Sequence, residues 1–541
     1  MLQLAVIVIL QSFISTSHSS SYLNNSFPSD FMFGAGTSAY QIEGAWNKDG
    51  RGETIWDNFV HGNASNIVGN ATGDISCNSY YKYKEDIRLA YLTGLNAYHF
   101  SIAWTRILPK GSNKLVSVKG VNYYQELLKE VKSYNLTPIV TLYHWDLPQF
   151  LQTQGGWTNK KTVDYFVNYT RVVFDTFKTV KYWITINDPR QICRGGYGIG
   201  TLAPGTKDSG VSDYKCAYYV LKAHAAVYHL YKTEFSNLNG LVSLALESPW
   251  SEPATKDKND VSATERSMMF DFGLYANPIF IGDWPTVVKE RVQYRSKNKK
   301  ERTRLPAFTD EEIKEIKGTA DFMAVKFFTT RLISDDKEAP YDETSFENDL
   351  RVKETLDPNW TINTFGKTIV PGSMRSFLKW IKDTYKNPSI IITANGIPDN
   401  GTFRYDEERV HYLGDYLNAV LEAIDKDKVR VHGYMYWSLL DSFEWTQGYS
   451  QHYGLYRINF DNPYRDRIAK SSVEYYRQVA TTKKIPDPSM VTTIHITTST
   501  TPQSTSSTTA KPTTASSVAS IVFCDILLLS TMMVFWTMVQ V

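Results

Sequence analysis

Eight short apolar runs, rich in β-branched and aromatic residues, recur along the chain, and longer stretches with helical periodicity separate them. The runs are Phe31–Tyr40, Ala97–Trp104, Thr137–Trp145, Tyr182–Asp188, Leu241–Glu247, Asp321–Thr329, Ser389–Asn395 and Val431–Leu440. Helical periodicity is clearest in Tyr165–Phe177, Ala217–Tyr231 and Val410–Ile424. Strands that alternate with helices in this number predict one (β/α)8 TIM barrel with long loops, over residues 24–485. The alternative, a doubly wound open sheet, is disfavoured because no glycine-rich phosphate-binding motif opens a helix.

The charge and cysteine content argue against several classes of protein. The 541 residues include 58 Lys and Arg against 56 Asp and Glu, a net charge of +2 that gives no case for binding nucleic acid. The four cysteines are too few for a disulfide scaffold, and none lies in a C-x-x-C pattern. We therefore expect no metal and no cofactor. The basic stretch Lys289–Arg304 is interpreted as a solvated loop rather than a binding patch.

The N-terminal segment is typical of a secretory signal peptide. Leu2–Ile14 is apolar and is followed by small residues that suit a cleavage site, although a positive n-region is missing. We predict a signal peptide over residues 1–18, because the apolar run is short for a membrane anchor. Seven N-x-S/T sequences fit the same route as N-glycosylation sites. They begin at Asn24, Asn63, Asn70, Asn135, Asn168, Asn359 and Asn400.

The C-terminal segments predict attachment to the outer face of the plasma membrane. Residues 486–517 become rich in Ser, Thr and Pro, which is typical of an O-glycosylated stalk. Residues 518–541 are almost wholly apolar, with no basic residue after them, and they match a GPI-attachment signal with its site among Ser504–Ser517. A single-pass helix is the alternative. Removal of the tail would remove Cys524, so that Cys193 and Cys216 become the expected disulfide.

Polar and aromatic residues gather at the ends of the predicted strands, where barrels of this kind hold their ligand sites. They are Gln41, Arg106, His144, Trp145, Asn187, Asp188, Trp437, Glu444 and Trp445. A lone Trp or His at a strand end is more often a packing residue. A whole set of such groups instead indicates a carbohydrate pocket, since a sugar has apolar C–H faces and a ring of hydroxyls.

Long motifs in these same segments resemble family-1 glycoside hydrolases, the β-glucosidase, myrosinase and lactase-like group that includes the klotho proteins. The matching segments are FMFGAGTSAYQIEGAW (31–46), SIAWTRILP (101–109), TLYHWDLPQ (141–149), GYGIGTLAPG (196–205) and YWSLLDSFEWTQGY (436–449). The resemblance runs through the whole barrel. It implies a retaining mechanism with two glutamates, an acid/base in a T-x-N-E-P motif and a nucleophile in I-T-E-N-G.

The chain departs from that pattern where the chemistry would occur. Strand four reads TINDP, so Asp188 takes the acid/base position, and strand seven reads ITANG, so Ala394 takes the nucleophile position. The family's N-x-Y at strand six is replaced by Lys326, Phe327 and Phe328, so the tyrosine hydroxyl is lost as well. An alanine methyl cannot form a glycosyl-enzyme. The positions that the resemblance assigns to sugar binding are retained: Gln41, His144, Trp145, Asn187, Trp437, Glu444 and Trp445.

Three functions compete. The first is a cell-surface pseudoenzyme that binds a β-glycoside or glycan without cutting it. The second is a klotho-like receptor for a protein partner, and the third is a residual hydrolase or transglycosidase that works through Asp188. The retained pocket residues favour the first, because a vestigial pocket has no reason to keep them.

The substitutions also change the expected charge of the pocket. Ala394 removes a carboxylate that the resemblance places near Arg106, and Lys326 adds a cation. Two unpaired buried cations would be costly, so we expect a negative partner. In one alternative, Asp188 or a bound chloride ion pairs with Lys326. In the other, the pocket binds an anionic sugar as its ligand.

Overall fold

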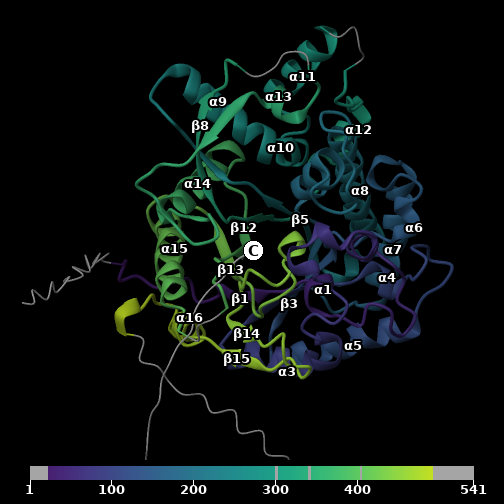
Figure 1. Cartoon of the computed structure of the whole chain (residues 1–541), viewed down its shortest axis with the longest axis vertical. Coiled ribbons are helices and arrows are strands. Elements are labelled where there is room, and N and C mark those ends of the chain that lie inside the picture. The colour runs from purple at the N-terminus through teal and green to yellow at the C-terminus, as the bar shows by residue number, and fades with distance from the viewer. Residues whose placement is uncertain (1–21, 299–302, 339–342, 402–404, 491–541) are drawn as a thin grey trace, which may run out of the picture. The chain divides into compact units, whose positions relative to one another are not determined.

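The computed structural model describes residues 22–298, 303–338, 343–401 and 405–490 (Figure 1). The predicted signal peptide, most of the Ser/Thr-rich segment, the apolar tail and Cys524 lie outside these residues. No helix within the described ranges is long and apolar enough to cross a membrane.

Eight parallel strands form a closed barrel in the order β1-β13-β12-β7-β5-β4-β3-β2. They are β1 (Met32–Gly36), β2 (Ala97–Ser101), β3 (Thr137–Tyr143), β4 (Tyr182–Asn187), β5 (Leu241–Glu247), β7 (Met323–Lys326), β12 (Ile390–Asn395) and β13 (Val431–Trp437). Each lies within one of the eight runs predicted from the sequence. The first and last strands close the barrel, with Met32 opposite Gly433 and Gly36 opposite Trp437. The predicted TIM barrel is confirmed.

Helices surround the barrel, while strands β1, β3, β5, β12 and β13 lie at the centre of the view (Figure 1). The helices are α1 (Ala39–Ile42), α2 (Ile55–Gly62), α3 (Ser79–Leu92), α4 (Trp104–Ile107), α5 (Val118–Ser133), α6 (Gln149–Gln152), α7 (Lys161–Thr176), α8 (Ser212–Glu234), α9 (Lys258–Met268), α10 (Leu274–Phe280), α11 (Thr286–Asn298), α12 (Asp310–Ile316), α13 (Phe346–Leu350), α14 (Pro371–Thr384), α15 (Glu407–Asp425) and α16 (Ser471–Thr482). In α7, Phe166, Tyr169 and Val173 recur at helical spacing and are fully buried, which fixes the face turned to the barrel.

The barrel has two apolar layers because its strands are covered on both faces. Trp183 on β4 points outward and packs edge-on against Phe174 of α7, with ring centroids 5.0 Å apart. The next residue, Ile184, points inward. It belongs to a buried cluster inside the barrel, whose members are Ala97, Ile139, Ile184, Ala245, Phe322, Ala324, Ile391 and Met435. This cluster fills the interior and leaves the strand ends to form the site.

Smaller elements extend the loops between strands. A three-stranded sheet contains β6 (Trp250–Pro253), β8 (Thr330–Asp335) and β9 (Val352–Thr355); two hairpins are β10 (Thr361–Ile362) with β11 (Thr368–Ile369) and β14 (Tyr456–Ile458) with β15 (Arg467–Ala469). Cys193 and Cys216 form a disulfide with their Cα atoms 5.4 Å apart. The loop expected over Lys289–Arg304 is wrong for its first part, which belongs to α11.

Candidate ligand site at the barrel mouth

A cavity of about 270 Å³ opens at the carboxyl ends of the barrel strands. It is lined by His144, Trp145, Asp188, Arg190, Gln191, Glu247, Pro249, Lys326, Phe328, Thr329, Lys367, Trp437, Glu444, Trp445 and Tyr453. Strand register places Glu247 of β5 opposite Lys326 of β7, and Lys326 opposite Ala394 of β12. These three positions, far apart in sequence, therefore lie side by side at the mouth.

One side of the cavity is aromatic. The Trp145 and Trp445 rings lie 4.4 Å apart, and His144 stacks on Trp437 at 5.9 Å. Trp145 and Trp445 have left-handed backbones, with φ of 72° and 55°, which non-glycine residues rarely adopt. Asn187 fixes this wall from below: its carbonyl accepts from the Trp145 indole at 3.0 Å, and its amide lies 3.1 Å from His144 Nε2. The aromatic faces are thus held in place before any ligand binds.

Glu444 is the acidic group of the aromatic side, and its described partners are neutral. The Ser442 hydroxyl donates to it at 2.6 Å, and Gln41 also hydrogen-bonds it. Burial raises the pKa of Glu444 to about 7. Gln41 itself is fully buried and donates to the Phe443 carbonyl at 2.9 Å. It therefore lies beneath the pocket, where it positions Glu444, and does not line the cavity.

The opposite side of the cavity is ionic. Lys326 Nζ donates to Asp188 Oδ2 at 3.4 Å, and Asp188 and Glu247 are hydrogen-bonded to each other. Arg190 lies 3.8 Å from Glu247 but donates at 2.7 Å to Asp271, outside the cavity. Burial and the charge of Glu247 raise the pKa of Asp188, while Arg190 and Lys326 hold that of Glu247 below its usual value despite burial. Of the two carboxyl groups, Asp188 therefore binds a proton more strongly than Glu247 does.

The imidazoles at the mouth are neutral. Burial and the Lys326 charge lower the pKa of His144 well below its usual range. His99 of β2 lies deeper, with Nε2 at 2.8 Å from the Thr141 hydroxyl, and burial lowers its pKa to about 4. Neither histidine can therefore neutralise the carboxylates.

The position that the resemblance assigns to the nucleophile is an alanine, which has no reactive group. Ala394 is buried and packs with Trp437, Tyr453 and Phe328, and its carbonyl accepts from the Phe327 amide at 3.1 Å. Phe328 extends to the cavity wall. Apolar contacts thus occupy the place that the resemblance gives to a carboxylate and its hydroxyl partner.

Arg106 does not belong to this site, so its assignment as a pocket cation is wrong. It lies after β2, in α4, and it is not among the residues that line the cavity. There it donates to Glu43 at 2.9 Å and stacks on Tyr80, 4.2 Å from the ring centroid. The expected ion pair of Lys326 with Asp188 is confirmed, so Lys326 needs no anionic ligand to neutralise it.

Several lining residues were missed from the sequence. Glu247 ends a predicted strand, and this was the signal that could have found it. Arg190 and Gln191 lie at the start of a helical segment directly after β4, and Lys367 and Tyr453 come from loops, where no periodicity marks a residue as facing the cavity.

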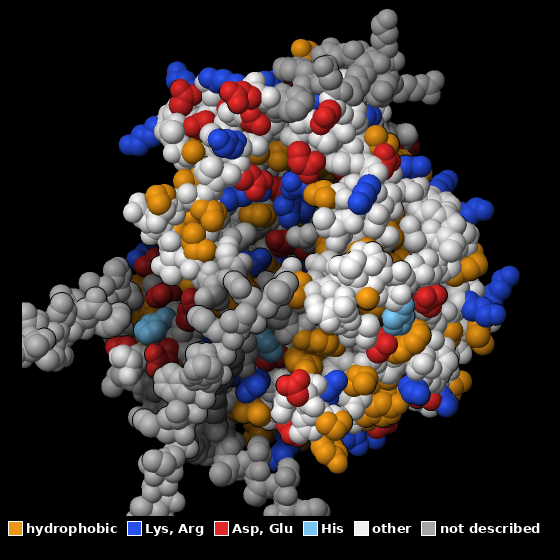
Figure 2. All heavy atoms as spheres, in the orientation of Figure 1, with side chains coloured by type: hydrophobic (Ala, Val, Ile, Leu, Met, Phe, Trp, Pro, Cys, Tyr) orange, Lys and Arg blue, Asp and Glu red, His pale blue; other side chains and the backbone are white. Residues whose placement is uncertain are grey.

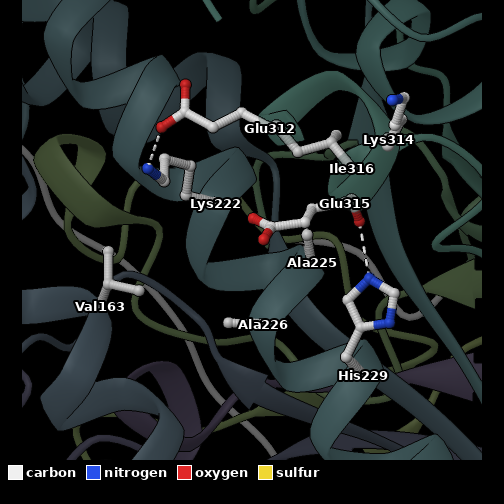
Figure 3. Close-up of a pocket in the computed structure, with 9 residues that line it drawn as sticks. All are labelled: Val163, Lys222, Ala225, Ala226, His229, Glu312, Lys314, Glu315 and Ile316. Atoms are coloured by element: carbon white, nitrogen blue, oxygen red, sulfur yellow. Dashed lines mark hydrogen bonds and ion pairs between the residues drawn. The ribbon is translucent and has the colours of Figure 1, made fainter. Parts of the chain in front are cut away.

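A larger cleft of about 570 Å³ lies outside the barrel, between α7, α8 and α12 (Figure 3). Lys222 pairs there with Glu312, and His229 Nε2 lies 2.7 Å from the Glu315 carbonyl. Its floor is formed by small and aliphatic side chains, and none of its residues was singled out from the sequence.

Charged side chains of both signs are interspersed over the face shown in Figure 2, with no single-sign field. The barrel mouth remains the candidate site.

Comparisons with known proteins agree with this geometry. The sequence model described as "Glycosyl hydrolase family 1" matches residues 23–485. The human lactase-like protein is 41% identical over 480 residues, covering 87% of this chain and 84% of that protein. Myrosinase 1 of Brevicoryne brassicae is 41% identical over 464 residues, covering 85% and 99%. Among solved structures, aphid myrosinase superposes with a TM-score of 0.81 at 40% identity, covering 84% of this chain and 99% of that one.

Proposed function

Because this chain belongs to glycosyl hydrolase family 1, we propose that it binds a β-glycoside or glycan at the barrel mouth without hydrolysing it. The observation that carries the proposal is the pairing of a prebuilt aromatic wall with an alanine at the nucleophile position. The lactase-like, myrosinase and β-glucosidase relatives support a glycoside as the class of ligand.

The aromatic side supplies what a sugar needs. Trp437 and Trp445 offer ring faces to the apolar C–H surface, and Glu444 offers carboxyl oxygens to hydroxyl groups. Because Ser442 and Gln41 already position Glu444, little side-chain entropy is lost when a ligand hydroxyl binds it.

The ionic side does not supply what hydrolysis needs. Retention requires two carboxyl groups about 5–5.5 Å apart, one of which attacks the sugar, and inversion requires about 6.5–9.5 Å, which leaves room for an attacking water. Asp188 and Glu247 instead hydrogen-bond directly to each other. Their charges are further balanced by Lys326 and Arg190. The pair therefore cannot act from opposite faces of a sugar ring.

We also propose that the protein acts at the outer cell surface through a lipid anchor. The Cys193–Cys216 disulfide suits an oxidising compartment. Asn24, Asn63, Asn70, Asn135, Asn359 and Asn400 are exposed and Asn168 is half-buried, so the predicted glycosylation sites are accessible. Release of the protein from expressing cells by phosphatidylinositol-specific phospholipase C tests the anchor; retention would favour the single-pass alternative.

The central test uses the purified full-length chain. We expect saturable calorimetric binding of methyl β-glucoside or a β-linked glycan, with hydrolysis of an aryl β-glucoside near background. Turnover at ordinary β-glucosidase rates would overturn the proposal. Absence of any sugar binding, together with a saturable protein ligand, would instead support the klotho-like receptor.

A further inference from the structure

The ionic side of the mouth holds an amine that glycoside binding does not use. Lys326 ends β7, and its side chain is 10% exposed and lines the cavity. The Lys326 nitrogen lies 5.7 Å from the centroid of the Phe328 ring and 5.9 Å from that of the Trp145 ring. The end of this side chain therefore lies inside the pocket, beside aromatic rings.

Two carboxyl groups lie next to this amine. Lys326 Nζ donates to Asp188 Oδ2 at 3.4 Å, and Asp188 is hydrogen-bonded to Glu247. Glu247 is also paired with Lys326 in the register of β5 and β7. Within the described part of the chain, no other group accepts a hydrogen bond from Nζ. The amine thus has a carboxyl pair on one side and N–H donors left for a ligand.

The two carboxyl groups differ in how strongly they bind a proton. Burial and the Glu247 charge raise the pKa of Asp188, whereas Arg190 and Lys326 lower that of Glu247 despite its burial. The pair can therefore hold a proton on one member while the other remains a carboxylate. Such a pair can both accept and return protons at a neighbouring atom.

An amine beside an acid and a base has a chemistry of its own. A lysine amine adds to the carbonyl carbon of an aldehyde or ketone and forms an imine. Positioned acid and base groups speed both the addition and the loss of water. The ammonium group must first give up a proton, and Asp188 is within hydrogen-bond distance to take it.

We propose that Lys326 forms a reversible imine with the carbonyl carbon of an open-chain reducing sugar. The ammonium group passes a proton to the Asp188–Glu247 pair, and the nitrogen lone pair forms a C–N bond as the C=O π bond breaks. The pair returns this proton to the carbonyl oxygen. A second N–H proton then moves through the pair to the new hydroxyl group, which leaves as water while the C=N bond forms. The water carries away the carbonyl oxygen and both protons, and no oxidant or reductant is used.

A sugar is the carbonyl compound that this cavity suits. Trp437 and Trp445 line it, and Glu444 offers carboxyl oxygens to hydroxyl groups. Its volume of about 270 Å³ is also below the ~300–1,000 Å³ of sites for drug-sized ligands, so the ligand is small. A glycoside has no free carbonyl group. Imine formation at Lys326 is therefore separate from glycoside binding and does not depend on it.

Reductive trapping in the full-length chain tests the proposal. The probe is D-glyceraldehyde, an aldose too short to close into a stable ring. Sodium cyanoborohydride converts its imines to stable secondary amines, and peptide mass spectrometry gives the rate of adduct formation at each lysine. Lys367 is the internal control, because it lines the same cavity but is half-exposed and forms no ion pair within the described residues. We expect Lys326 to be modified at least about tenfold faster than Lys367.

A variant of the carboxyl pair tests the proton transfers. Asp188→Asn is expected to lower the ratio of the two rates about tenfold, because an amide does not relay the proton. The control is Asp175→Asn, which removes a surface carboxylate paired with Lys178 and should leave the ratio unchanged. Thermal unfolding confirms that both variants are folded. Modification of Lys326 no faster than that of Lys367 in the wild type, or an unchanged ratio in folded Asp188→Asn, would overturn the proposal.

Discussion

The two sides of the barrel mouth contain carboxyl groups in opposite settings. On the aromatic side, Glu444 receives hydrogen bonds from the neutral side chains of Ser442 and Gln41. On the ionic side, Asp188 is in contact with a second carboxyl group, Glu247, and with the ammonium group of Lys326. Burial raises the pKa of both Glu444 and Asp188, yet of these two groups only Asp188 forms an ion pair, with Lys326.

This difference indicates that the ionic side has been rebuilt. Ala394 and Phe328 pack with Trp437 and Tyr453, and Lys326 has an acidic partner. Each residue that departs from the family's pattern on this side thus has a packing or ionic partner within the described residues. On the aromatic side, the Trp145 and Trp445 rings lie 4.4 Å apart, and the Lys326 ammonium group lies 5.9 Å from the centroid of the Trp145 ring.

The largest expected effect is on hydrolysis, when the residues of the ionic side are changed back to those of the family's pattern. We expect Ala394→Glu alone to leave hydrolysis near background, because Phe328 offers no hydroxyl and Lys326 would pair with the new carboxylate. Combined with Phe328→Tyr, Lys326→Asn and Asp188→Glu, it should raise kcat/KM for an aryl β-glucoside by about 1,000-fold or more.

Adding Glu247→Gln should raise that rate further, since Glu247 would otherwise hydrogen-bond the restored acid. The control variant carries the same substitutions, except that Ala394→Gln replaces Ala394→Glu. Glutamine has nearly the volume of glutamate but no nucleophilic carboxylate. Thermal unfolding confirms that each variant is folded. An inactive but folded set would show that groups beyond these positions have changed.

On the aromatic side, Glu444→Gln should change how stability depends on pH. A carboxyl group whose pKa is raised by folding binds more protons in the folded state, so its favourable contribution is present below its unfolded pKa and is lost as pH rises through about 7. Glu444→Gln has no titratable carboxyl group at this position, so its stability does not fall with pH for this reason. Relative to the wild type, its free energy of unfolding in urea should improve by up to about 3 kcal/mol between pH 5 and pH 8. A difference independent of pH would contradict the neutral-donor setting of Glu444.

On the ionic side, Lys326→Met should have its effect at high pH. Without the ammonium group, two adjacent carboxyl groups repel, the pKa of Asp188 rises further, and stability falls as pH rises. We expect a loss of about 2 kcal/mol at pH 8 and little change at pH 5, measured by urea unfolding. Lys367→Met is the control, because Lys367 lines the same cavity but is half-exposed and forms no ion pair within the described residues. Equal losses for both variants would mean that Lys326 contributes no specific pairing.

The smallest expected effect is on glycoside binding, when one aromatic residue on each side of the cavity is substituted. Trp437→Leu should weaken glycoside binding about tenfold through loss of its ring face, whereas Phe328→Leu should weaken it by less than about threefold. Isothermal titration with methyl β-glucoside measures both. A larger loss for Phe328→Leu would place the sugar against the rebuilt side.

The architecture could be predicted from sequence because its signal is local. Runs such as Thr137–Trp145 and helical periodicity such as Tyr165–Phe177 are repeated within a few residues, and each marks an element that is present. The substitutions at Asp188 and Ala394 were equally visible, since a motif is read along the chain.

Partners and directions of side chains had to come from the tertiary structure. Asp188 and Lys326 are 138 positions apart, and only barrel register brings the end of β7 beside that of β5 and Glu247.

Arg106 was misplaced because the turn that follows a strand decides whether a side chain faces the barrel axis, and residue spacing does not encode this. Arg291 was taken for a solvated residue for a similar reason, because the carbonyl group that holds it comes from Asp349, far along the chain. Local sequence thus determined the elements and the departures from the family's motifs at Asp188 and Ala394. Closure of the barrel decided which charges meet, because long-range packing fixes which side chains share a buried space.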